Sequence, residues 1–128
     1  MNLTEKAQVI FQANKDKGFH ENHPYEERST LLLLVISEIS EAFEALRHDP
    51  PKHVEPDDMM WMDSCMDYGH KYTEFFPDRI KDTHEDEIAD AIIRLLDYCG
   101  SFDIDIEAHI KHKLEYNKTR PYKHGKTV

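Results

Sequence analysis

Hydrophobic positions recur with a helical period over most of this chain. From Ile88 to Cys99 they follow the i, i+3, i+4, i+7 spacing of one helix face. Runs that alternate apolar and polar residues, as strands do, are nearly absent. Capping residues, glycines and prolines then predict where each helix begins and ends. We expect helices over residues 4–16, from Ser29 or Thr30 to about 47, from Thr83 or His84 to 99, and from Asp103 or Asp105 to about 118.

Glycines and prolines separate these elements. Gly18 is expected to end the first helix and Gly100 the one that starts near residue 84. The stretch 48–83 holds four of the six prolines, so we expect an irregular or partly helical insertion there, with a helix from Asp57 to about Tyr72. The expected fold class is all-α: a bundle of four to five helices. We expect residues 1–128 to form one domain whose end, 119–128, is a basic tail.

Composition adds an expectation about assembly. Apolar residues make up 39% of the 128 positions and charged residues 33%. This balance suits a small helical protein whose faces are either core or highly charged, or one that completes its core by self-association. The run Leu31–Ile36 covers every side of its helix, so this segment is either buried all round or part of a subunit interface. We therefore expect a homodimer or a dimer of dimers.

Charge and cysteine usage exclude several classes of protein. Acidic residues outnumber basic ones by 26 to 16, a net charge of −10, which disfavours binding to a nucleic acid polymer. Cys65 and Cys99 lie far apart and form no CxxC motif, so neither a disulfide framework nor a zinc knuckle is indicated. The longest apolar run has six residues, too few to span a membrane, and no secretion signal is evident. We expect a cytoplasmic protein.

Two pairs of acidic residues are the candidates for chemistry. Glu38 and Glu41 share a helix face, and the helical neighbours of Glu38 are apolar. A carboxylate in such surroundings is costly unless it is paired or bound to metal, although a solvated rim at the edge of the core is the alternative. Taken alone, Glu87 and Asp90 point away from the apolar stripe of their helix, where solvent-exposed residues are expected. Together, the two pairs would form a four-carboxylate box suited to Mg²⁺, with Mn²⁺ as a substitute.

The end of the chain is basic. Residues 111–128 contain six lysines and arginines against one acid, Glu115. Lys113 and Asn117 lie one turn apart, and Arg120 continues their face, an arrangement that can hold phosphate oxygens. The alternative is that cations complement the dipole of a helix end, which does not account for the basic residues beyond the expected helix end.

The role of Trp61, in the 48–83 insertion, has two interpretations. Trp61 can stack on a nucleobase, as aromatic side chains do. Packing in a core or an interface is the other interpretation, and its methionine neighbours in the MMWM segment favour it.

Three segments in this order resemble one family. SEISEAFEALR (37–47), DEIADAIIRLLDYCG (86–100) and DIDIEAHIKHKLEYNKTRPYKHGK (103–126) resemble the MazG-like all-α nucleoside triphosphate pyrophosphohydrolases, which carry ExxE, then ExxD, then a Lys…Asn…Arg series. The resemblance covers about residues 3–47 and 80–126. It implies that Mg²⁺ is held by Glu38, Glu41, Glu87 and Asp90. It also implies that the triphosphate is contacted by Lys113, Asn117 and Arg120. Ser37 stands where many members carry a further glutamate.

The activity expected from this resemblance is the Mg²⁺-dependent hydrolysis of a nucleoside or deoxynucleoside triphosphate to the monophosphate and pyrophosphate. A metal-positioned water would attack the α-phosphorus, and Glu38 would take its proton or act only as a metal ligand. Two alternatives stay open. One is hydrolysis of a phosphoribosyl-nucleotide by a member of the same superfamily. The other is a non-enzymatic helical protein that binds a partner and whose carboxylates form a solvated face.

Overall fold

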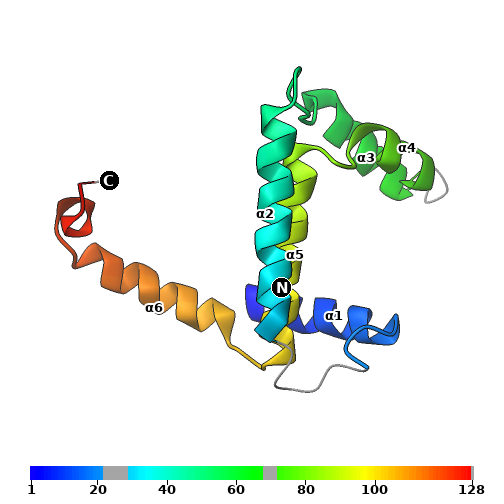
Figure 1. The fold of residues 1–128 in the computed structure, drawn as a ribbon. Helices are drawn as coiled ribbons and strands as arrows, with labels where there is room; N and C mark the ends of the chain where they lie inside the picture. Colours follow the sequence, from blue (N-terminus) through cyan, green and yellow to red (C-terminus); the bar gives the residue numbers. More distant parts are fainter. Residues whose placement is uncertain (22–28, 68–71, 128) are drawn as a thin grey trace. The chain divides into compact units, whose positions relative to one another are not determined.

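The structure is a computed structural model that describes residues 1–21, 29–67 and 72–127. It is all-helical in this part of the chain, with no strand among these residues, which confirms the predicted all-α class (Figure 1). The elements are α1 (Leu3–Asp16), α2 (Leu31–Arg47), α3 (Pro56–Asp67), α4 (Tyr72–Arg79), α5 (His84–Ser101), α6 (Ile106–Lys118) and the 3₁₀ helix η3 (Tyr122–Gly125). Within the described ranges, no helix is long and apolar enough to cross a membrane.

The chain divides into two compact units. The first comprises residues 1–28 and 96–128, and the second comprises residues 29–95. Helix α5 contributes its first three turns to the second unit and its end to the first. That the whole chain forms a single domain stays a prediction.

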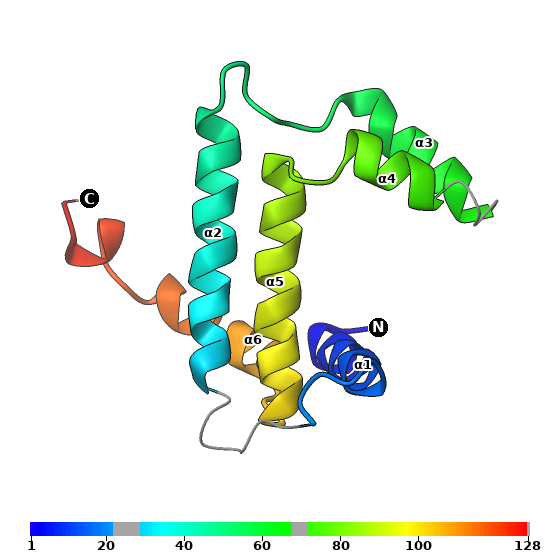
Figure 2. The ribbon, with the colours of Figure 1, turned by 45° about the vertical axis from the view of Figure 1, so that its right-hand side comes forward.

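In the second unit, α2 and α5 lie side by side and run in opposite directions (Figures 1 and 2). Their contact is lined by small buried side chains, among them Ala42, Ala45 and Ala91. Lys52, in the segment after α2, forms a backbone hydrogen bond with each of the two helices. Its N–H donates to the Ala45 carbonyl at 2.9 Å, and its carbonyl accepts from the His84 N–H at 2.8 Å. These two backbone hydrogen bonds link the end of α2 to the start of α5.

The insertion 48–83 is partly helical, and its helices form a second pair in this unit, α3 and α4 (Figure 2). Met62, Cys65 and Ile80 are buried there. The helix that we predicted over 57–72 is wrong in extent, because α3 ends at Asp67 and a separate helix begins at residue 72. Packing of the two short helices on each other replaces the longer helix.

In the first unit, α1 packs against the end of α5 and the start of α6. Its core contains Ala7, Leu96 and Cys99. Hydrogen bonds join the start of α1 to the start of α6. The Thr4 hydroxyl donates to Asp105 at 2.7 Å and accepts from the Glu107 N–H at 3.0 Å.

Two of the helix starts follow the predicted chemistry and one does not. The Thr83 hydroxyl accepts from the Asp86 N–H at the start of α5, and the Asp105 carboxylate accepts from the Ala108 N–H at the start of α6. Thr30, in contrast, has helical backbone angles and its side chain makes no capping hydrogen bond to α2.

Gly100 does not end the helix as predicted, because α5 continues to Ser101. A Cβ atom at position 100 would lie 2.6 Å from the Ala7 carbonyl oxygen and 2.6 Å from Phe11 Cβ. The missing side chain therefore allows α5 to approach α1 closely. The chain leaves the helix only at Asp103, whose φ is +56°.

Candidate functional site

Three of the predicted carboxylates meet between α2 and α5. Glu38 and Glu41 project from α2 and Glu87 from α5, and one oxygen of each lies within 4.8 Å of the others. Only 8% of Glu38 and 7% of Glu87 are exposed, whereas Glu41 is exposed. A solvated rim therefore does not describe Glu38 or Glu87. Buried carboxylates at this spacing need a compensating positive charge or a shared proton.

Arg94 supplies part of that charge. Its Nε donates to Glu38 Oε1 at 2.6 Å. Burial by itself would raise the pKa of Glu38, but the hydrogen bond and positive charge of Arg94 lower it overall, with a further contribution from Glu41. Glu38 is therefore ionised at neutral pH. The sequence analysis missed Arg94, although its spacing of four residues from Asp90 places both on one face of α5.

Among the described residues, no lysine or arginine forms an ion pair with Glu87. Burial, followed by the carboxyl groups of Glu41 and Glu38, raises its pKa to about 7. One arginine for three carboxyl groups leaves excess negative charge inside a cluster of oxygen atoms. An all-oxygen donor set of this kind fits Mg²⁺ or Mn²⁺, which prefer carboxylate ligands, better than it fits zinc.

Asp90, the fourth predicted ligand, lies one turn further along α5 and is half-buried. Its carboxylate is not among the three that gather within 4.8 Å. Burial raises its pKa, as do the charges of Asp86 and Glu38. Asp90 thus lies at the edge of the cluster, where the negative charges of the other carboxylates still act on it.

A second acidic group adjoins the first. Asp82, Asp86 and Glu87 each offer an oxygen within 4.8 Å of the others, so Glu87 belongs to both groups. Asp82 has a φ of +66°, and its N–H donates to Asp86 at 3.0 Å. The sequence analysis did not single out this group.

The predicted phosphate-binding residues lie on α6 and just after it, in the first unit. Lys113 Nζ and Arg120 Cζ lie 5.2 and 5.9 Å from the centre of the Tyr116 ring, so one aromatic ring contacts both cations. The Asn117 Oδ1 atom is buried and accepts no hydrogen bond from the described residues. Lys118 instead pairs with Glu115 at 2.8 Å. That these residues and the carboxylates serve one site stays a prediction.

One buried histidine was not anticipated. Nε2 of His20 lies 2.9 Å from both carboxylate oxygens of Asp97, and the ring packs edge-on against Phe11. His20 has a φ of +71°, a backbone conformation that this contact helps to hold. No local sequence pattern joins residues 20 and 97, so only the folded chain shows the pair.

No protein-family model, curated protein or solved structure matches this chain. A function for this chain must therefore be inferred from its own residues and from the order of its motifs.

Proposed function

We propose that this chain is a Mg²⁺-dependent nucleoside triphosphate pyrophosphohydrolase of the MazG-like type, which converts its substrate to the monophosphate and pyrophosphate. One observation carries the proposal. Glu38, Glu41 and Glu87 converge from two helices within 4.8 Å, two of them are buried, and a single arginine offsets their charge. Such a cluster is unfavourable by itself and becomes favourable when it holds a divalent cation.

In this proposal the carboxylates of α2 and α5 hold the metal: Glu38, Glu41, Glu87 and Asp90. Bound Mg²⁺ supplies a Lewis acid that polarises phosphoryl oxygens and orients a water. Arg94 donates to Oε1 of Glu38 and keeps this carboxylate ionised. An ionised Glu38 could bind the cation or accept a proton from water. The water oxygen ends on the monophosphate, and pyrophosphate leaves.

We assign the binding of the phosphate groups to Lys113, Asn117 and Arg120 in the first unit. Lys113 and Arg120 would donate charge-assisted hydrogen bonds, and the Asn117 amide would donate through its nitrogen. Tyr116 holds both cations through its ring and so reduces the freedom that they lose when phosphate binds.

We further propose that the chain self-associates through α2, as a homodimer or a dimer of dimers. In the described structure Leu33, Ile36 and Phe43 are exposed, Ile36 to 60%. Contiguous apolar surface of this kind marks an interface. We expect light scattering to show a dimer or tetramer at micromolar concentration and Ile36→Glu to shift it to monomer. A stable wild-type monomer would contradict this part of the proposal.

The activity is tested by measuring pyrophosphate release from the four deoxynucleoside triphosphates with and without Mg²⁺. We expect release only with the cation. Glu41→Gln should lower it by more than about a hundredfold, since even residues that merely support metal ligands contribute roughly 10- to 100-fold. Glu44→Gln, one turn along the same helix and exposed, is the matched control and should be active. Release of pyrophosphate from a phosphoribosyl-nucleotide alone would support the second enzyme instead.

A further inference from the structure

The insertion contains a pocket that the proposed chemistry does not use. Helices α3 and α4 and the segment before them enclose a cavity of about 580 Å³, within the range of small-molecule sites. Trp61 and Phe75 form two of its walls, with ring centres 6.3 Å apart and planes inclined by 35°. Trp61 is 60% exposed, so its ring is available to a ligand. Two neighbouring aromatic faces suit a flat, unsaturated ring.

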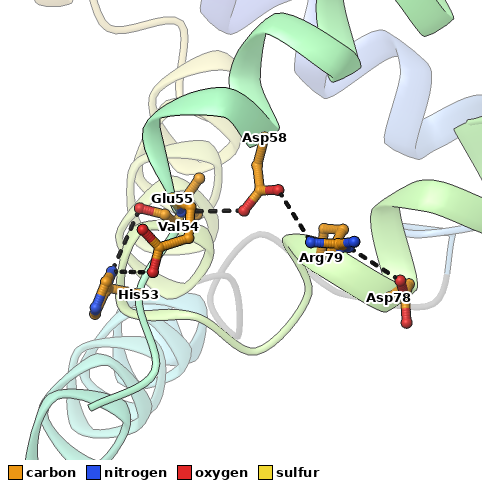
Figure 3. Close-up of polar contacts among 6 residues, drawn as sticks. All are labelled: His53, Val54, Glu55, Asp58, Asp78 and Arg79. Atoms are coloured by element: carbon orange, nitrogen blue, oxygen red, sulfur yellow. Dashed lines mark hydrogen bonds and ion pairs between the residues drawn. The ribbon is translucent and has the colours of Figure 1, made fainter. Parts of the chain in front are cut away.

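The polar part of the pocket is rich in hydrogen-bond acceptors. Arg79 is the one cation among the lining residues, and it is already engaged. Its Nη1 lies 3.7 Å from Asp58, and its Nε donates to Asp78 at 3.2 Å (Figure 3). The guanidinium also lies over the Phe75 ring. The other charged lining residues are all acidic: Glu55, Asp57 and Asp58. Asp58 is buried and accepts from the Glu55 N–H at 3.0 Å, so its position is fixed. Asp57 is exposed and lines the pocket, so its carboxylate can accept hydrogen bonds from a ligand.

We infer that this pocket binds the base of the nucleotide and selects bases that carry an exocyclic amino group, an inference that rests on the proposed function. The base stacks on Trp61 and Phe75, and its N–H groups donate to the carboxylates. Three acids against one occupied arginine repel phosphate, so the triphosphate stays outside the pocket. Adenine, cytosine and guanine have the amino group, whereas thymine lacks it.

Trp61 is the only tryptophan of the chain, so its fluorescence reports on binding at this residue. We would titrate the protein with the 5′-monophosphates of deoxyadenosine, deoxycytidine, deoxyguanosine and thymidine, with excitation at the red edge of tryptophan absorption. The first three should quench Trp61, and thymidine monophosphate should bind about tenfold more weakly, as expected for one lost charged hydrogen bond.

Two variants keep the reporter and change the pocket. Phe75→Leu removes one stacking wall and should weaken binding of all four nucleotides by about tenfold. Asp57→Asn should narrow the difference between deoxycytidine and thymidine nucleotides. Met66→Leu, an exposed position of α3 outside the pocket, is the control and should leave every titration unchanged.

The inference is overturned if no monophosphate quenches Trp61, or if all four quench it equally. Its failure is distinguishable from failure of the proposed function, because monophosphates are not hydrolysed to pyrophosphate. Pyrophosphate release without quenching refutes the base pocket and leaves the hydrolase proposal standing. Selective quenching without pyrophosphate release supports the pocket and refutes the hydrolase proposal.

Discussion

Replacing Glu87 by glutamine removes a carboxyl group whose ionisation the fold opposes. Glu87 is 7% exposed and lies against Glu38 and Glu41, and burial followed by these neighbours raises its pKa from 4.5 to about 7. The folded chain therefore holds this proton more tightly than the unfolded chain does. Glutamine has the same size and is neutral at every pH. The variant thus isolates the cost of one negative charge in the cluster.

The sign and size of the effect follow from this difference in pKa. Below about pH 4 the group is protonated in both states, and it does not penalise folding. As the pH rises, the unfolded chain loses the proton first, so the free energy of unfolding falls until the pH passes the folded pKa of about 7. A difference between 4.5 and about 7 corresponds to about 3 kcal/mol at most. Glu87→Gln avoids this loss.

The assay is urea unfolding of both proteins in the presence of a chelator, from about pH 4 to about pH 8. We expect the advantage of Glu87→Gln over wild type to grow by about 2–3 kcal/mol across this range. Glu44→Gln, whose parent side chain is 70% exposed, should show a difference from wild type that does not change with pH. An advantage of Glu87→Gln that stays constant with pH would refute the reasoning, because the buried charge would then not be the cause.

Three further predictions concern the metal, the tail and the packing of α5. Mg²⁺ or Mn²⁺ should raise the melting temperature of wild type, because a hundredfold excess over Kd adds about 2.7 kcal/mol to the free energy of unfolding. Glu41→Gln should abolish this rise. Calorimetry that shows no shift in wild type contradicts the metal site. Lys113→Ala and Arg120→Ala should each lower kcat/KM by about ten- to a hundredfold with little change in melting temperature. Lys118→Ala should have little effect on kcat/KM. Equal, small losses of kcat/KM at all three positions would mean that the tail only attracts the charged substrate and does not bind its phosphates. Gly100→Ala should cost about 1–3 kcal/mol in urea unfolding because its Cβ would lie 2.6 Å from two atoms of α1, and an unchanged midpoint would show that the helices separate freely.

The sequence by itself located α1, α2, α5 and α6, because helix formation depends on neighbours within one or two turns. The 3.6-residue period located α5, Thr83 and Asp105 capped the helices that they were expected to cap, and α1 ends just before Gly18. The same local reasoning was wrong for Gly100. A glycine ends a helix or admits a neighbouring chain, and only the packing of α5 on α1 decides between the two.

The candidate site divides in the same way. The spacing of Glu38 and Glu41 put them on one face of a helix, and the apolar neighbours of Glu38 indicated that this carboxylate is buried. That Glu87 joins them more closely than Asp90 does, and that Arg94 pairs with Glu38, depends on the register of α2 against α5. That register is set by side chains far apart in the chain. Periodicity describes one helix at a time, and distances between helices follow only from how their side chains pack.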